Sequence, residues 1–134
     1  MIDQYTMLLQ DHFSWERWEQ LIVDEGVQLD RPQSTPHPLY PDIIYPMNYG
    51  YICNTTSSDH AEVDVFVGSG APKLVGLIMT HDYRQKDREI KLLWRCIPSE
   101  VYLAHGFINF DRSKLKGQLV LRYPMKKLWD MMNH

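Results

Sequence analysis

Apolar residues recur along this chain with two different spacings, which predict a helix followed by a series of strands. In residues 14–25 the spacing is three to four positions, as in an amphipathic helix. The apolar stripe of this helix consists of Trp15, Trp18, Leu21 and Ile22. We expect Ser14 to cap the start of the helix and Gly26 to end it. A stripe of this kind indicates a core or subunit contact rather than a ligand site.

Strand patterns fill the middle of the chain, and turn-forming residues separate them. The predicted strands are residues 27–30, 43–45, 49–53, 63–67, 74–80, 90–96 and 118–123. The segments 74–80 and 90–96 are mostly apolar, so we expect them to be buried on both faces. Pro98 favours a helix over residues 98–105, with Gly106 at its end. The tail from residue 125 onwards is amphipathic.

The order of these elements predicts an α+β fold, a small OB-like antiparallel β-barrel with flanking α-helices. A chain of 134 residues favours a single domain, residues 1–134. Within it we expect the N-terminal helix at 14–25, the barrel at about 27–96, and a C-terminal helix and strand at 98–123. The proline-rich residues 31–41 are expected to form an extended loop.

Composition and charge narrow the class of protein. No apolar run approaches the roughly 20 residues of a membrane span, and the first residues lack the basic start of a secretory signal. We therefore expect a cytoplasmic protein, with Cys53 and Cys96 reduced. A net charge of −3 argues against a nucleic-acid partner. Residues 1–30 are mainly acidic and residues 111–134 mainly basic. Opposite charges of this kind attract the two ends of the chain within a monomer or between subunits, or else belong to two solvated surfaces. We expect a homo-oligomer.

Four aspartates are candidates for a cation site. Asp59 and Asp64 flank an acidic segment before one apolar strand, and Asp82 and Asp87 lie five positions apart in a later hairpin. Hard cations such as Mg²⁺ bind carboxylates together with the phosphate oxygens of a substrate. The alternative is that these residues are turn formers and strand-edge charges that bind nothing. A zinc site is a further alternative that lacks the usual ligand spacing; its ligands would be His60, His81 and His105.

Two motifs resemble those of family I soluble inorganic pyrophosphatases. Residues 45–52, YPMNYGYI, resemble the family segment YPxNYGxI, and residues 59–65, DHAEVDV, resemble its DxDPxDV signature. Asp82 and Asp87 match the later pair of family aspartates in spacing. The resemblance covers residues 29–94 and implies an OB-like barrel, dependence on Mg²⁺, and hydrolysis of pyrophosphate to two phosphates.

The resemblance also implies roles for individual residues. Asp59, Asp64 and Asp87 would hold a first metal ion, and Asp64 would bridge to a second. Asp82 with Asp87 would take metal ions that arrive with the substrate. Tyr49 would donate a hydrogen bond to a phosphate. In this scheme the protein positions the phosphates and screens their charge.

The sequence departs from the family at the general base and at the phosphate-binding cations. Ala61 replaces the aspartate that orients or deprotonates the attacking water in the family. Glu62 is the candidate substitute, although strand alternation points it to the other face. Glu89 stands at an expected lysine position, and Lys91, on the same face, is the candidate replacement together with Arg31.

These losses predict reduced turnover. Removing a general base costs about 10²–10⁴ in rate. The sequence therefore predicts a pyrophosphatase that is slow. The alternatives are a catalytically impaired binding or assembly module with the same fold, and a hydrolase of another phosphoanhydride.

Overall fold

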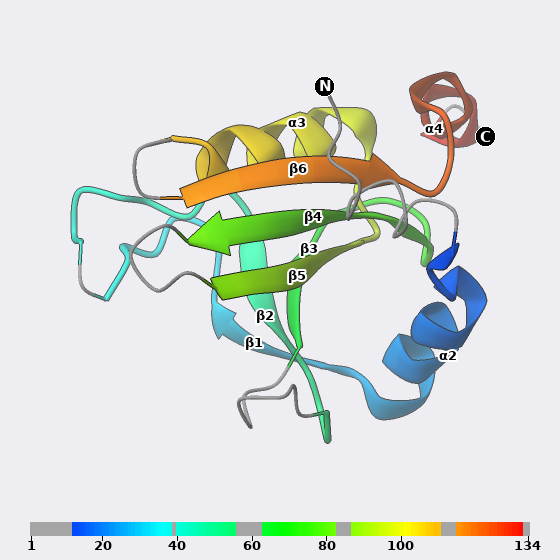
Figure 1. Cartoon of the computed structure of the whole chain (residues 1–134), viewed down its shortest axis with the longest axis horizontal. Coiled ribbons are helices and arrows are strands. Elements are labelled where there is room, and N and C mark those ends of the chain that lie inside the picture. Colours follow the sequence, from blue (N-terminus) through cyan, green and yellow to red (C-terminus); the bar gives the residue numbers. More distant parts are fainter. Residues whose placement is uncertain (1–11, 39, 56–62, 83–86, 111–114, 133–134) are drawn as a thin grey trace.

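A six-stranded, strongly curved sheet forms an open OB-like barrel at the centre of the molecule (Figure 1). The computed structural model describes residues 12–38, 40–55, 63–82, 87–110 and 115–132, without the side chains of Asp87 and Met132. The strands are β1 (Val27–Arg31), β2 (Asn48–Ile52), β3 (Asp64–Val67), β4 (Leu74–Asp82), β5 (Asp87–Trp94) and β6 (Leu115–Leu121). Their order is β1-β2-β3-β5-β4-β6, and every pair is antiparallel except β3 and β5. The α+β prediction is confirmed.

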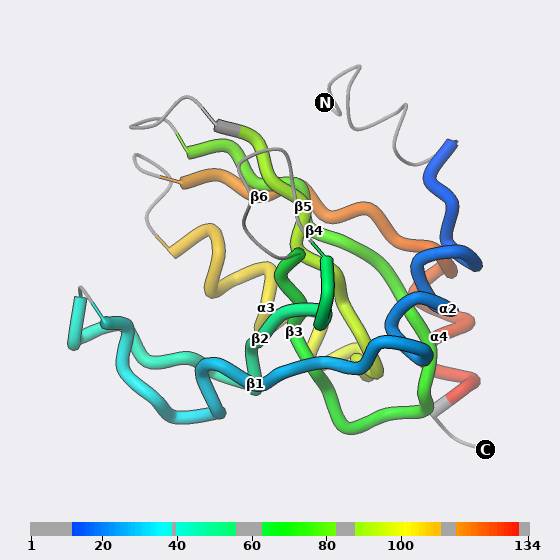
Figure 2. Tube along the Cα trace, turned by 90° about the horizontal axis from the view of Figure 1, so that it is seen from below, coloured from blue at the N-terminus to red at the C-terminus, as the bar shows by residue number. Residues whose placement is uncertain are grey.

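The two apolar strands form the middle of the sheet as their sequences predict. β4 is paired on both edges, with β5 and with β6. It is buried from Leu74 through Thr80 because its side chains alternate between two covered faces of the sheet. β6 therefore extends the sheet beyond residue 96, the end of the barrel that the sequence suggests. Figure 2 shows these three strands running side by side.

The first described helix, α2 (Trp15–Glu25), confirms the prediction from the apolar stripe. Ile22 is buried, and the other members of the stripe pack around it against the sheet. Ser14 occupies the N-cap position as expected, but its side chain makes no capping hydrogen bond. Gly26 follows the helix with φ +82°, a value that favours glycine, and the chain continues into β1.

The second helix, α3 (Pro98–Ile108), continues past Gly106, which we expected to end it. Asn109 ends the helix instead: its side-chain amide donates to the carbonyl oxygens of His105 and Gly117 and accepts from the Gly117 N–H. These bonds tie the end of the helix to β6. The amphipathic tail forms a third helix, α4 (Met125–Met132).

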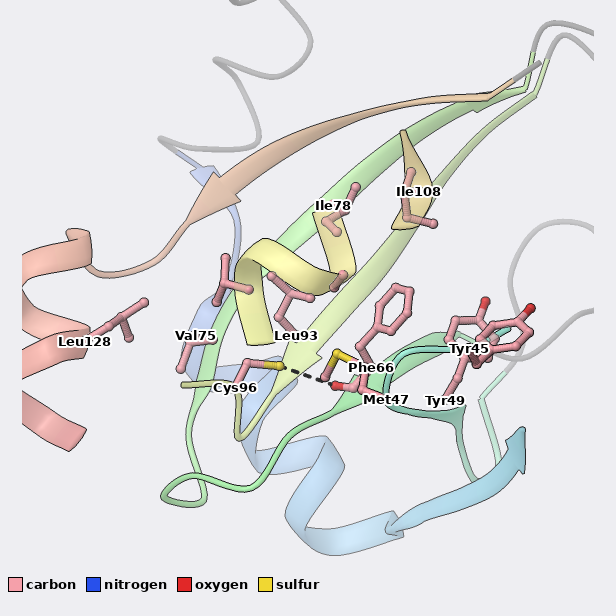
Figure 3. Packing of buried hydrophobic residues seen from close by; sticks show 12 residues of the cluster. Tyr45, Met47, Tyr49, Phe66, Val75, Ile78, Leu93, Cys96, Ile108 and Leu128 are labelled. Atoms are coloured by element: carbon pink, nitrogen blue, oxygen red, sulfur yellow. Dashed lines mark hydrogen bonds between the residues drawn. The ribbon is translucent and has the colours of Figure 1, made fainter. Parts of the chain in front are cut away.

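Two apolar clusters lie on opposite faces of the sheet. One lies between the sheet and α3 and contains Phe66, Leu93 and Val101 (Figure 3). The other lies between the sheet and α2 and contains Ile22 and Leu92. Leu92 and Leu93 face opposite sides because side chains alternate along a strand. Figure 3 shows Tyr45 and Tyr49 at one end of the α3-side cluster.

Residues 32–38 and 40–45 form a loop held by backbone hydrogen bonds rather than the predicted extended loop. The Ser34 N–H donates to the Tyr45 carbonyl oxygen at 2.8 Å, and the His37 N–H donates to that of Ile43 at 2.7 Å. The strand expected at 43–45 is reduced to one isolated bridge, between Pro36 and Ile44. The loop therefore folds back on itself and returns Tyr45 to the end of β1. No helix in the part of the chain that the structure describes is long and apolar enough to cross a membrane.

Candidate active site

Three polar side chains from three strands meet at one end of the α3-side cluster. Lys91 Nζ lies 2.9 Å from Asp64 Oδ2 and 2.9 Å from the Tyr49 hydroxyl, and it donates a hydrogen bond to each. The Tyr49 hydroxyl donates to the same Asp64 oxygen at 2.7 Å. The three groups form a closed triangle of hydrogen bonds, which we call the Lys91 triad.

The register of the sheet explains why these residues meet. Asp64 on β3 is the direct partner of Lys91 on the parallel strand β5. On the other side of β3, Asp64 is opposite Tyr51, and Tyr49 lies two positions away on the same face. Diagonal neighbours of this kind are within reach of an aromatic side chain. The triad therefore depends on pairing between segments that are far apart in the sequence.

Burial and charge set the ionisation of the triad. The Lys91 side chain is 12% exposed and that of Asp64 is 32% exposed. Burial disfavours charge on Lys91, but interactions with Tyr49 and Asp64 outweigh it, so the pKa of Lys91 is raised. Burial, and then the nearby carboxylate, raise the pKa of Tyr49 well above its usual range. At neutral pH Lys91 is therefore an ammonium and Tyr49 a phenol.

A second cation, Arg31, lies close to the triad. Its Nη1 donates to the Tyr45 hydroxyl, and its guanidinium carbon lies 5.3 Å from the Tyr45 ring centroid and 5.8 Å from that of Tyr49. Burial works against the charge of Arg31, yet the hydrogen bond to Tyr45 keeps its pKa raised. Lys91 Nζ lies 5.5 Å from the Tyr49 ring centroid. Two cations thus lie close to the ring of Tyr49.

A glycine allows Arg31 to approach this closely. Arg31 is the partner of Tyr49 across the β1–β2 ladder. A Cβ atom at the next residue, Gly50, would lie 2.1 Å from the carbonyl oxygen of Gln28 on β1, which is closer than any contact can be. Glycine at position 50 of the YPMNYGYI segment is therefore required for β1 to pair with β2.

The structure brings together Tyr49, Asp64 and Lys91 among the predicted site residues, with Arg31 nearby. Asp59, Ala61 and Glu62 lie outside the described residues, and so do the side chain of Asp87 and the zinc candidate His60.

Asp82 lies away from the triad. It is opposite Asp87 at the end of the β4–β5 ladder. Asp87 is four residues before Lys91 on β5, so Asp82 is offset from Asp64 by roughly 13 Å along the strand direction and by two strands across the sheet.

The other histidines proposed as zinc ligands are not gathered. His81 is on β4 and His105 is on α3, where a ring nitrogen lies 3.2 Å from the Gly117 carbonyl oxygen. Across residues 12–38, 40–55, 63–82, 88–110 and 115–131, no three His, Cys, Asp or Glu side chains are grouped to hold a metal ion.

Sequence reasoning missed two contacts of the site. Tyr45 is part of the YPMNYGYI segment but was given no role, although it is the hydrogen-bond acceptor for Arg31. Glu89 was considered only as a replaced lysine, whereas its Oε2 lies 3.5 Å from Lys91 Nζ. Glu89 is two residues before Lys91 on β5 and therefore on the same strand face, which is the signal in the sequence that would find it.

Comparison with known protein families identifies the family of this chain. The sequence profile of the inorganic pyrophosphatase family matches residues 24–99, more than half of the chain. The chain belongs to the inorganic pyrophosphatase family. The matched region contains Arg31, Tyr49, Asp64 and Lys91. Comparison with curated protein sequences gave no significant match.

Solved inorganic pyrophosphatases are among the structures similar to this one. The enzyme from Neisseria gonorrhoeae is 15% identical, with a TM-score of 0.53 over 83% of this chain and 92% of that one. The enzyme from Helicobacter pylori is 15% identical, with a TM-score of 0.47 over 80% and 90%. The enzyme from Thermus thermophilus is also 15% identical, with a TM-score of 0.47 over 80% and 86%. The similarity to the Neisseria structure shows a shared fold. At a sequence identity of 15% it shows nothing about function.

Inorganic pyrophosphatases generally use a divalent metal ion. The hydrogen bonds to Asp64 decide whether its carboxylate is available to such an ion. A carboxylate commonly bridges two metal ions by giving one oxygen to each. In this chain Asp64 Oδ2 already accepts from the Lys91 ammonium and the Tyr49 hydroxyl. The residues present therefore do not fit a bridge in which each Asp64 oxygen binds one metal ion.

Proposed function

We propose that this protein hydrolyses pyrophosphate to two phosphates, slowly and with Mg²⁺ as the required divalent ion. The observation that carries the proposal is the family match over residues 24–99, which spans the Lys91 triad and Arg31. In the reaction a water oxygen forms a bond to one phosphorus while the bond from that phosphorus to the bridging oxygen breaks. One proton of the water passes to the general base, and both products are phosphates.

The described residues support binding and orientation of the substrate. The Lys91 ammonium and the Arg31 guanidinium supply positive charge. The Tyr49 hydroxyl, which donates to Asp64 in this structure, would turn its one O–H to a phosphate. Charge-assisted hydrogen bonds to phosphate are the strong ones, and arginine matches phosphate geometry in two-point contacts. Asp64 holds Lys91 and Tyr49 in place through the bonds to its Oδ2.

The proposed metal site draws on residues beyond the triad. Asp59, Asp82 and Asp87 are the carboxylates that we propose for Mg²⁺, a hard cation that prefers oxygen ligands. Asp64 is the fourth, and we propose that it takes a metal ion only together with the substrate, because Lys91 holds it otherwise. Glu62 is the residue that we propose as substitute base for the aspartate missing at Ala61. These assignments rest on the motif spacing in the sequence.

A second candidate function is a catalytically impaired module that binds pyrophosphate or assembles with partners. The specific observation in its favour is the Lys91–Asp64 ion pair, which uses an oxygen that a metal-dependent reaction would need. A third candidate function is hydrolysis of another phosphoanhydride. The two cations would bind the phosphate groups of any such substrate, whatever its leaving group.

We further propose a single pyrophosphatase-like domain over residues 1–134. We place it in the cytoplasm as a homo-oligomer without nucleic-acid or membrane partners. The acidic N-terminal and basic C-terminal regions of the sequence are the feature that supports association between subunits.

Phosphate release from pyrophosphate with Mg²⁺ tests the proposal, with Asp64→Asn and Asp87→Asn as variants. We expect measurable release by the parent and a loss of about 10²-fold or more in both variants. Absence of release by the parent, or unchanged rates in both variants, would contradict hydrolysis. Calorimetry with pyrophosphate then identifies the second candidate, since binding without turnover is its signature.

A further inference from the structure

We propose that Lys91 is a built-in cation that occupies the Asp64 carboxylate in place of a divalent metal ion. Asp64 then contributes no metal affinity to the protein in the absence of substrate. The inference concerns metal occupancy alone and does not depend on the proposed hydrolysis.

The first observation is the position of the ammonium. Lys91 Nζ lies 2.9 Å from Asp64 Oδ2, a full charge-assisted hydrogen bond, and the two residues are direct partners in the parallel β3–β5 register. The backbone pairing fixes both Cα atoms. The contact is therefore built into the sheet rather than made by two free surface side chains.

The second observation is the confinement of the lysine. Its side chain is 12% exposed, and its ammonium also donates to the Tyr49 hydroxyl and lies 3.5 Å from Glu89 Oε2. Moving this lysine away from its three oxygen partners would cost much free energy, because a buried ammonium without partners carries a large desolvation penalty. A metal ion that approached Asp64 would have to displace it or accept repulsion from it.

The third observation concerns the neighbouring carboxylates. Asp64 and Glu89 carry two negative charges beside Lys91, and the ammonium neutralises one of them. Clustered carboxylates repel one another unless a cation lies between them. Here a side chain of the same chain supplies that cation, so the described part of the cluster does not need a metal ion for its charge balance.

Titration with Mn²⁺ in the absence of substrate tests the inference, with free Mn²⁺ measured by electron paramagnetic resonance. The variants are Asp64→Asn, Lys91→Met and the double variant, and the matched control is Lys116→Met, an exposed lysine on β6. We expect the parent, Asp64→Asn and Lys116→Met to bind Mn²⁺ equally. Lys91→Met should bind about tenfold more tightly, and the double variant should lose that gain, because removal of the ammonium frees the carboxylate.

Two results would overturn the inference. One is a tenfold or greater weakening of Mn²⁺ binding in Asp64→Asn relative to the parent. The other is a Lys91→Met variant that folds and binds no more tightly than the parent. If Lys91→Met does not fold, Lys91→Gln, which keeps a hydrogen-bond donor without the charge, replaces it.

A measurement on the parent alone completes the test. We expect the side-chain nitrogen resonance of Lys91 to stay unchanged when Mg²⁺ is added, because the ammonium keeps its place on Asp64. A shift or loss of that resonance at Mg²⁺ concentrations that leave the other lysine signals unchanged would contradict the inference.

Discussion

The ammonium nitrogen of Lys91 lies 2.9 Å from Oδ2 of Asp64. The two residues are 27 positions apart and are joined by the one parallel pairing in the sheet. In the sequence, Asp64 ends the segment that resembles the pyrophosphatase signature, and Lys91 lies two residues beyond the expected lysine position. The structure therefore links the acidic and cationic parts of the candidate site directly.

The Lys91–Asp64 pair should contribute to stability. Asp64→Asn leaves a confined ammonium without its carboxylate, and we expect a loss of roughly 1–3 kcal/mol in the free energy of unfolding. Urea denaturation of the parent, Asp64→Asn, Lys91→Met and the double variant measures it. The double-mutant cycle should give a coupling energy of at least about 0.5 kcal/mol, whereas additive effects would show that the pair is not formed.

The Tyr49 hydroxyl should matter for both stability and pyrophosphate binding. Tyr49→Phe removes a donor to Asp64 and an acceptor for Lys91, and we expect a loss of about 1 kcal/mol in stability and about tenfold in pyrophosphate affinity. Tyr102→Phe is the matched control, because Tyr102 is 62% exposed on α3. Calorimetry with pyrophosphate checks the affinity. Equal affinities for the two variants would remove Tyr49 from the binding site.

Stability should fall in mild acid in part because of His37. Burial and the positive charge of Arg31 lower the pKa of His37. Below about pH 6.5 the unfolded chain therefore binds more protons at this residue than the folded protein does, so stability decreases as the pH falls. The unfolding midpoint in urea should drop less between about pH 7 and pH 5 in His37→Asn than in the parent. Identical drops would show that His37 does not contribute.

The Glu100 carboxylate should be important for the connection between β3 and α3. It accepts hydrogen bonds from the Ser69 N–H, the Ser69 hydroxyl and the Ile97 N–H. We expect Glu100→Ala to lower the free energy of unfolding by roughly 2–3 kcal/mol, since backbone donors are left without an acceptor. Glu16→Ala, at an exposed position in the first turn of α2, should cost under about 1 kcal/mol. Similar losses in both variants would contradict this role.

The two cysteines should react at different rates with a thiol reagent. Cys96 is 4% exposed, and burial, with the nearby Glu100 carboxylate, raises the pKa of its thiol, so little thiolate is present to react. Cys53 is partly exposed. A Cys53→Ser variant should therefore lose the fast reaction and react only on unfolding. A fast reaction that persists in this variant would place Cys96 at the surface.

Local patterns predicted most of the secondary structure. The three-to-four spacing of Trp15, Trp18 and Ile22 identified α2, and the apolar runs identified β4 and β5, because these patterns depend on burial of one face or two. The end of α3 was misjudged because Asn109, whose side chain reaches β6, stops the helix. A glycine in open space, such as Gly106, does not have to end a helix.

The candidate site was predicted only in part. Tyr49, Asp64 and Lys91 were each selected, but their contact depends on the parallel register of β3 and β5, which no local pattern specifies. The same holds for Arg31 and Tyr45, which meet because the loop between them folds back. Strand alternation indicated the correct face for Lys91, while the identity of its partner required the tertiary pairing.

The most direct test of the account is the rate of phosphate release from pyrophosphate in the presence of Mg²⁺. The parent should release phosphate, Asp64→Asn should be slower by about 10²-fold or more, and Asp24→Asn, an exposed residue on α2, should match the parent. Equal rates for Asp64→Asn and the parent, or no release by the parent, would contradict it.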